Sequence, residues 1–139
     1  RLLTSSDKRV ADIAEKASKE VAYHLERSGD TVVGLGDGTD ESHQRMQAAL
    51  EYHWDYIGEM FVSDSVDAAL VKAGIAPDPA SLRGEWDDLV GRYLKAATLK
   101  IPGDGYVHKG GKTGQHTEHL GFVLADMQFL QRAYPGAEW

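Results

Sequence analysis

Apolar residues recur at steps of three and four along most of the chain, a spacing typical of amphipathic helices. The first such stretch follows Ser6 and Asp7, either of which can cap a helix, and ends at Gly29. Its apolar stripe consists of Val10, Ile13, Ala14, Ala17, Val21 and Leu25. Residues 28–42, SGDTVVGLGDGTDES, are rich in glycine and short polar residues, so we predict a connection there.

Four further helices follow in the same pattern. The second covers residues 42–61, and its apolar face comprises Met46, Ala49, Leu50, His53, Ile57, Met60 and Phe61. A shorter helix over residues 65–73 ends at Gly74. The fourth, over residues 79–100, carries Leu82, Trp86, Leu89, Val90, Tyr93 and Ala97. The last covers residues 117–132, and its inward-facing apolar residues are Leu120, Val123, Leu124, Met127 and Leu130.

Five helical stretches without an alternating strand pattern predict an all-α fold. Three of these stretches are long enough to run the length of a helical bundle. A chain of 139 residues fits one domain, so we predict a single helical domain over residues 1–139. The chain begins at Arg1 rather than Met, in a segment that already reads as helical, and we therefore expect it to lack an N-terminal part.

The net charge of the chain is acidic, with 15 Lys and Arg against 22 Asp and Glu. This balance argues against a nucleic-acid surface and against an anionic membrane as partners. There is no apolar run long enough for a membrane span and no signal-peptide core, so a soluble cytoplasmic protein is expected. The absence of cysteine excludes disulfides and thiolate chemistry, which leaves histidines, carboxylates and hydroxyls as chemical candidates.

One loop reverses this charge. Residues 105–117 contain no acidic residue, and their cationic and imidazole side chains lie among four glycines just before the last helix. Backbone N–H groups before a helix start can bind a phosphate or a carboxylate. The candidate contact residues are Lys109, Gly110, Gly111, Lys112 and His116. The spacing is not that of a P-loop, and a solvated or partner-facing loop explains the same residues.

Two long helices each place one histidine on their apolar stripe, His24 on the first and His53 on the second. In bundles with a di-iron centre, two helices supply a Glu three residues before such a His. Here those positions hold Val21 and Leu50, so a competent di-iron site is not expected. Glu20 lies four residues before His24 and can only form an ordinary charge pair with it. We interpret both histidines as core residues satisfied by hydrogen bonds, with a remodelled metal site as the alternative.

A second cluster comprises His116, Glu118 and His119. Two histidines three residues apart can share a helix face, but zinc needs a further ligand and an orienting shell. Capping of the helix by His116 or Thr117, with Glu118 in its first turn, explains the cluster equally well.

Several separate blocks agree with one known family in order and spacing. They are KEVAYHLERS at 19–28, GDGTDES at 36–42, GIAPDPASLRGEW at 74–86, GGKTGQHTEHLG at 110–121, LADMQFLQR at 124–132 and PGAEW at 135–139. In these blocks the chain resembles the structural, non-catalytic (PaaC-type) subunits of the bacterial multicomponent phenylacetyl-CoA epoxidase. Family members are longer, so the chain resembles their C-terminal part.

The resemblance implies a ferritin-like helical bundle, here partial, with no cofactor in this chain. It implies a catalytic partner subunit whose di-iron centre epoxidises the ring of phenylacetyl-CoA in aerobic phenylacetate catabolism. The chain would then be a structural subunit rather than an enzyme by itself, and the basic loop would contact the CoA ester or the partner. Without the first helices of the bundle, the faces around His24 and His53 should be uncovered, unless a second copy of the chain or an N-terminal piece covers them.

An independent metal-dependent oxidase or hydrolase is the alternative function. It would use the inward histidines together with the second cluster, namely His24, His53, His116 and Glu118. Three or more of these side chains would have to converge on a common point at about 2.0–2.3 Å.

Overall fold

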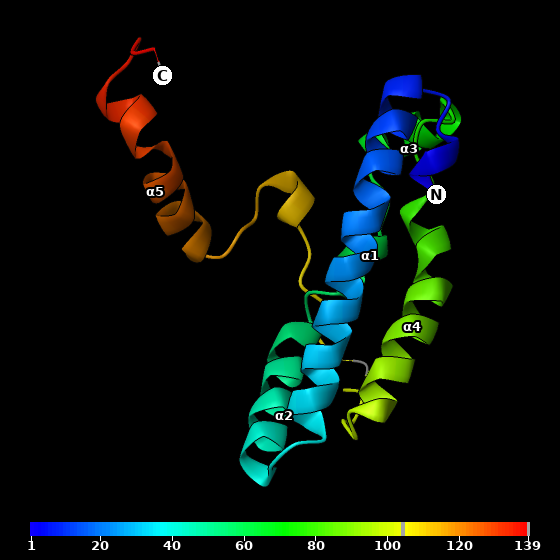
Figure 1. The fold of residues 1–139 in the computed structure, drawn as a ribbon. Helices are drawn as coiled ribbons and strands as arrows, with labels where there is room; N and C mark the ends of the chain where they lie inside the picture. Colours follow the sequence, from blue (N-terminus) through cyan, green and yellow to red (C-terminus); the bar gives the residue numbers. More distant parts are fainter. Residues whose placement is uncertain (104, 139) are drawn as a thin grey trace. The chain divides into compact units, whose positions relative to one another are not determined.

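The computed structural model describes residues 1–103 and 105–138, and all of its regular elements are helical. In chain order they are α1 (Lys8–Gly36), α2 (Asp40–Trp54), α3 (Ser65–Lys72), α4 (Arg83–Ala96) and α5 (His119–Ala133), shown in Figure 1. The predicted all-α fold is confirmed. The chain divides into two compact units, residues 1–107 and 108–139, and each is described by itself. One domain over the whole chain stays a prediction.

Helix α1 is longer than predicted, because it continues through most of the segment expected to be a connection. Asp7 caps its start by accepting hydrogen bonds from two backbone N–H groups. Gly29 does not end the helix; it is buried against α4, and a Cβ there would lie 2.7 Å from Cδ1 of Tyr93. Gly36 is buried in the same way, with Ala97 O 2.5 Å from the position of a Cβ. These two glycines allow α1 and α4 to approach closely.

Helix α2 begins earlier than predicted and ends earlier too. Thr39 caps its start in a capping box with Ser42, whose side chain accepts a hydrogen bond from the Thr39 N–H. The helix ends at Trp54, and a tighter 3₁₀ turn, η2 (Gly58–Phe61), replaces the predicted last turns. Gly58 faces Val107, whose Cγ1 lies 2.7 Å from the position of a Cβ on the glycine. The prediction of one helix over residues 42–61 is therefore wrong at both ends.

Helix α3 lies where the sequence predicted it, and Gly74 ends it with φ of 71°. The predicted fourth helix is divided into a 3₁₀ turn, η3 (Pro79–Leu82), and α4, which ends at Ala96 rather than at residue 100. Thr98 stops α4, because it adopts the left-handed conformation with φ of 58° and directs the Leu99 N–H to Leu94 O.

The core of the first unit lies where α2, α4 and the C-terminal half of α1 meet. Its buried residues are Leu94, Ala97 and Leu99, and the partly buried residues packed on them are Val32, Val33, Met46, Leu50, Trp54 and Val90. The side chain of Gln47 fixes the segment after α4, since its amide donates to Lys100 O (3.0 Å) and accepts from Lys100 N (2.9 Å).

The start of α1 is held separately. Ser5 Oγ donates to Ile75 O and Ser6 Oγ donates to Ala73 O, each at 2.7 Å. Helix α1 is therefore attached near its N-terminus to the segment after α3 and along its C-terminal half to α2 and α4. Between these attachments its apolar side chains, such as Ile13 and Leu25, are exposed.

The second unit consists of the basic loop from residue 108 onward, which includes a short 3₁₀ turn, η4 (Gly111–Thr113), and of α5. Most large apolar side chains of α5 are exposed within this unit. Among the described residues, none of the helices is both long and apolar enough to span a membrane.

Candidate functional site

The positions that resemble a metal site lie on the exposed middle of α1 and on α2. Val21 is 60% exposed, and the side chains of His24 and Glu20 are 66% and 74% exposed. His24 Nε2 lies 3.9 Å from Glu20 Oε1, which is the ordinary i,i+4 charge pair predicted from the sequence. His53 is exposed as well.

The interpretation of His24 and His53 as hydrogen-bonded core residues is therefore wrong for this chain. The physical reason is that α2 and α4 cover only the C-terminal half of α1, so no other helix of the first unit covers the stripe that carries His24. The rings of His53 and Tyr52 instead make a T-shaped contact, with centroids 5.0 Å apart. Leu50 differs from these residues because it is partly buried against the core. Within the first unit, the expectation of an uncovered face is confirmed for the stripe of α1 that carries His24. The face of α2 that carries His53 is instead partly covered, since Met46 and Leu50 pack on the core.

The residues present do not fit a di-iron centre. Each would-be bridging carboxylate is replaced by an apolar side chain that cannot ligate a metal, Val21 on α1 and Leu50 on α2. Within residues 1–103 and 105–138, no group of three or more histidines and carboxylates is close enough to hold a metal ion. Within each unit taken by itself, the described residues therefore do not converge as the alternative enzyme would need.

The basic loop is wound around one carbonyl group. Gly110 O accepts hydrogen bonds from Thr113 N (3.0 Å), Thr113 Oγ1 (3.0 Å) and Gln115 N (2.8 Å). Gly110 and Gly114 flank the turn with φ of 100° and 92°, a left-handed conformation that favours glycine. A larger residue at position 110 would also clash with Gln115, since a Cβ there would lie 2.6 Å from Gln115 Oε1. The glycines of this loop therefore shape a tight turn.

This winding limits what the loop can bind through its backbone. The N–H groups of Thr113, Gly114 and Gln115 donate to carbonyl groups inside the loop, so they are not directed at an anion. Lys109, Lys112 and His116 are exposed. The loop is thus a tight turn with exposed cationic side chains, and these three backbone N–H groups are used within the turn itself.

Helix α5 starts at the last residue of the second histidine cluster, later than predicted. Its N-cap is Glu118, which makes no side-chain capping hydrogen bond, and its first residue is His119. The prediction that His116 or Thr117 caps the helix is wrong. Threonine commonly caps helices through its hydroxyl, but here Thr117 contributes only its carbonyl, which accepts from Leu120 N (3.2 Å).

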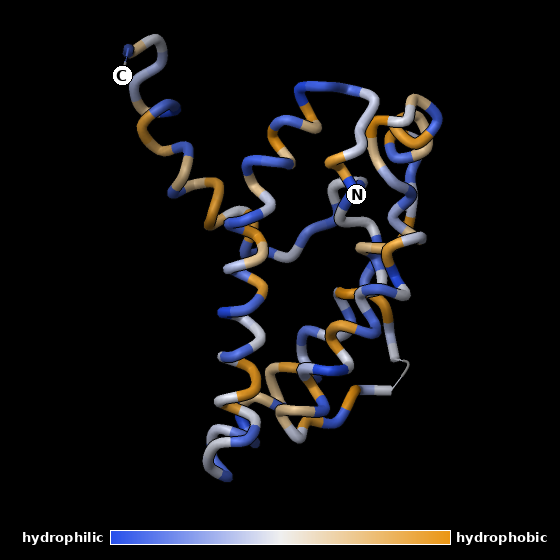
Figure 2. Tube along the Cα trace, turned by 45° about the vertical axis from the view of Figure 1, so that its right-hand side comes forward, coloured by the Kyte–Doolittle hydropathy of each residue, from blue (hydrophilic) through white to orange (hydrophobic). Residues whose placement is uncertain are grey.

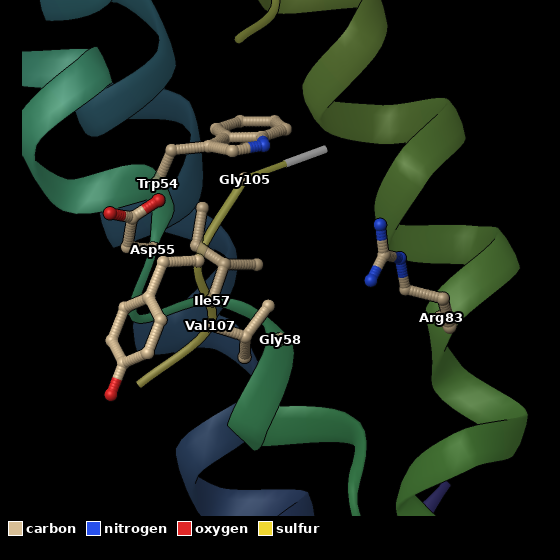
Figure 3. Close-up of a pocket in the computed structure, with 8 residues that line it drawn as sticks. Trp54, Asp55, Ile57, Gly58, Arg83, Gly105 and Val107 are labelled. Atoms are coloured by element: carbon tan, nitrogen blue, oxygen red, sulfur yellow. The ribbon is translucent and has the colours of Figure 1, made fainter. Parts of the chain in front are cut away.

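A small pocket in the first unit was not predicted from the sequence. Figure 3 shows it between the end of α2, the segment around Val107 and α4, with Arg83 directed toward it from α4. Its lining residues are Trp54, Asp55, Ile57, Gly58, Arg83, Gly105, Tyr106 and Val107. They come from three separate stretches of sequence, so no local motif signals the pocket.

Arg83 is held firmly beside this pocket. Its Nε lies 2.8 Å and 2.9 Å from the two carboxylate oxygens of Asp87. Its guanidinium carbon lies 5.1 Å from the ring centroid of Phe61 and 5.7 Å from that of Trp86, within the range of cation–π contact. The pocket volume of about 90 Å³ is far below the ~300 Å³ at which small-molecule sites begin, so a CoA ester does not fit inside it.

Comparison with known proteins places these features in a family. A family model described as "Phenylacetic acid catabolic protein" matches residues 1–139. The chain is 46% identical over 139 residues to a subunit of the 1,2-phenylacetyl-CoA epoxidase of Escherichia coli (strain K12). The match covers 100% of this chain and 56% of that relative, so the chain spans a little over half of the relative's length. Trp139, in the last block of the resemblance, lies outside the described residues. The chain belongs to the phenylacetic acid catabolic protein family, whose PaaC-type members are ferritin-like helical bundles.

Proposed function

We propose that the chain is a non-catalytic structural subunit of a cytoplasmic phenylacetyl-CoA epoxidase. In this role it supports the catalytic subunit whose di-iron centre epoxidises the substrate ring in aerobic phenylacetate catabolism. The observation that carries the proposal is the apolar pair Val21 and Leu50, which stands where a di-iron bundle would need two glutamates. The similarity to one subunit of a phenylacetyl-CoA epoxidase supports the assignment to this pathway.

The exposed apolar surface of the chain supports a packing role. Large side chains of α1 and α5, including Val21, Tyr23, Phe122 and Met127, are more than half exposed. Exposed apolar patches of this kind mark interaction sites, because covering them removes apolar area from water. In this proposal the catalytic subunit covers these exposed apolar faces. A second copy of the chain is the other candidate.

Iron content and turnover test the non-catalytic role directly. The full chain and the catalytic subunit are purified separately and together, and each sample is assayed for iron by elemental analysis and for epoxidation of phenylacetyl-CoA. We expect iron and turnover to follow the catalytic subunit, with the present chain raising the stability or activity of the pair. Stoichiometric iron with turnover in the chain alone would instead support the independent metal-dependent enzyme.

We also propose that the basic loop contacts the CoA ester or the partner subunit through its side chains. Lys109 and Lys112 lie in the stretch without acidic residues, and the turn around Gly110 O holds that stretch in a fixed shape. Charged hydrogen bonds to phosphate are among the stronger polar contacts, so the CoA phosphates are suitable ligands. The lysines, and not the backbone, would make these contacts.

A paired substitution tests the loop. Lys109→Ala with Lys112→Ala should weaken binding of phenylacetyl-CoA by the assembled complex roughly tenfold or more, as expected for the loss of two charge-assisted contacts. The control is Lys16→Ala with Lys19→Ala, which removes two exposed lysines of α1 and the same total charge. An equal loss in both variants would indicate a general charge effect. Unchanged binding in the loop variant, with intact assembly, would leave the loop a structural element.

A further inference from the structure

The pocket beside Arg83 contains one edge of a guanidinium group that has no acceptor. Arg83 Nε lies 2.8 Å and 2.9 Å from the carboxylate oxygens of Asp87, so this ion pair uses the Nε side of the group. Within residues 1–103 and 105–138, no hydrogen bond or ion pair involves the two terminal nitrogens of Arg83. These nitrogens carry most of the N–H donors of an arginine. Figure 3 shows them directed toward the pocket.

Arg83 is also held on the faces of its guanidinium group. The guanidinium carbon lies 5.1 Å from the ring centroid of Phe61 and 5.7 Å from that of Trp86. Apolar and charged residues alternate at short intervals along α4, as Figure 2 shows, and Arg83 and Trp86 share one face of this helix. Trp86 packs in turn on Trp54, with ring centroids 5.9 Å apart. The unused edge of Arg83 therefore has a fixed orientation, and little side-chain entropy is lost when a ligand binds to it.

The indole N–H of Trp54 provides a second donor at the pocket. Trp54 is half-buried, its N–H can only donate, and no described residue accepts a hydrogen bond from it. Figure 3 shows the indole nitrogen on the side of the ring nearer to Arg83. Asp55 lies across the pocket from Arg83 in the same view, and no ion pair joins these two described residues. A group with acceptor oxygens between Trp54 and Arg83 would satisfy donors on both sides.

The size and charge of the pocket favour a carboxylate group as this acceptor. The volume of about 90 Å³ corresponds to roughly three water molecules. A cavity that takes up benzene measures about 150 Å³, so the ring of an aromatic acid would stay outside while its carboxylate enters. A carboxylate is planar and accepts two parallel hydrogen bonds from a guanidinium edge. A phosphate dianion would meet stronger repulsion from Asp55 and Asp87, because it brings two negative charges rather than one.

We propose that the pocket beside Arg83 binds one carboxylate group, which accepts hydrogen bonds from the terminal nitrogens of Arg83 and from the indole N–H of Trp54. A small free acid and an acidic side chain of a polypeptide segment both present this group, and the pocket recognises the chemistry that they share. The inference does not rest on the proposed function, because it concerns a site within the first unit of this chain.

The test uses acetate, which is little more than a carboxylate, and acetamide as a neutral probe of the same shape. The indole N–H signal of Trp54 and the Nε–H signal of Arg83 are followed by NMR in the full chain at constant ionic strength. We expect saturable shifts with a Kd for acetate on the order of 1–10 mM. Acetamide should bind at least about tenfold more weakly, because it lacks the charge.

Two arginine variants locate the site. Arg83→Gln should weaken acetate binding, measured at Trp54, by about tenfold or more, because the charged donors are lost. The matched control is Arg92→Gln, which removes an exposed arginine of the same helix that does not line this pocket. Its Kd should stay within about twofold of the wild type, since only screened long-range charge is lost. Thermal unfolding of each variant shows whether it is folded.

A third probe distinguishes the two sources of the carboxylate. N-acetylglutamate amide models an acidic side chain on a polypeptide, and it is titrated into the wild type in the same way. Tighter binding than that of acetate would assign the site to a polypeptide side chain, because the neighbouring backbone then contributes. Weaker binding would assign it to a small free acid.

Four results would overturn the inference. They are shifts that never saturate with acetate, equal responses to acetate and acetamide, equal weakening by Arg83→Gln and Arg92→Gln, and tighter binding of inorganic phosphate than of acetate. If Arg83→Gln does not fold, the comparison of acetate with acetamide on the wild type still decides whether the pocket selects a carboxylate.

Discussion

Replacing single glycines of α1 with alanine tests the close approach of α1 and α4. Gly36 faces the backbone just after α4, and an added Cβ would lie 2.5 Å from Ala97 O and 2.7 Å from Ala97 Cβ. Because the nearest atom belongs to the backbone, the helices must move apart. Gly34 lies on the same helix with nothing within 4 Å of a Cβ, so it is the matched control.

The two substitutions should change stability in opposite directions. Gly34→Ala should raise the free energy of unfolding by about 0.5–1 kcal/mol, because alanine favours the helix. Gly36→Ala should lower it by about 1–3 kcal/mol through overpacking of the contact with Ala97. The difference between the variants is therefore about 1.5–4 kcal/mol. Urea denaturation followed by circular dichroism measures it, with similar slopes expected for both variants.

A third variant, Gly29→Ala, compares a clash with a side chain to the clash with the backbone at Gly36. Gly29→Ala would meet the ring of Tyr93, which can rotate, so its cost should be smaller than that of Gly36→Ala. Adding Tyr93→Ala should remove the penalty of Gly29→Ala in a double-mutant cycle. If Gly36→Ala were as stable as Gly34→Ala, the helices would not pack as closely as described.

The remaining predictions concern stability at single sites. Gln47→Leu should lower the free energy of unfolding by about 1 kcal/mol, because both hydrogen bonds to the backbone after α4 are lost, whereas Gln44→Leu on the exposed side of α2 should change little. Asp64→Ala should cost about 1 kcal/mol by removing the N-cap of α3, visible as a lower thermal midpoint; an unchanged midpoint would contradict the capping role. Val21→Glu should change stability by less than about 0.5 kcal/mol, whereas Leu50→Glu should cost about 2–4 kcal/mol by placing a carboxylate against the core. Equal tolerance of Val21→Glu and Leu50→Glu in denaturation would refute the described burial of Leu50.

The positions of the helices could be predicted from apolar periodicity, but their ends could not. Glycine commonly ends a helix, and this expectation holds at Gly74, where φ is positive. It fails at Gly29, which lies inside α1 and is needed for close contact with Tyr93, about 60 residues away in sequence. A local pattern contains no sign of such a contact. The end of α4 at Thr98 could not be predicted either, because threonine rarely adopts the left-handed conformation that it has here.

The candidate sites divide in the same way. Left-handed glycines and exposed lysines in the basic loop follow from local composition, and the structure has both. Whether His24 is buried depends on which elements pack on the middle of α1. Apolar periodicity predicts the stripe that carries His24, but it does not predict which element packs on that stripe. The pocket beside Arg83 combines three distant segments, so it required the fold to be known.

The two attachments of α1 have a consequence for how it opens. A helix held at both ends cannot fray inward from its termini. Its middle can open only by local unfolding between the two attachments. Such unfolding breaks backbone hydrogen bonds, and the unfolded turns must be nucleated again when they refold. Amide hydrogen exchange around Val21 and His24 should therefore be slow for so exposed a segment. The apolar side chains there are presented on an already ordered backbone, so a partner that covers them loses little conformational entropy on binding.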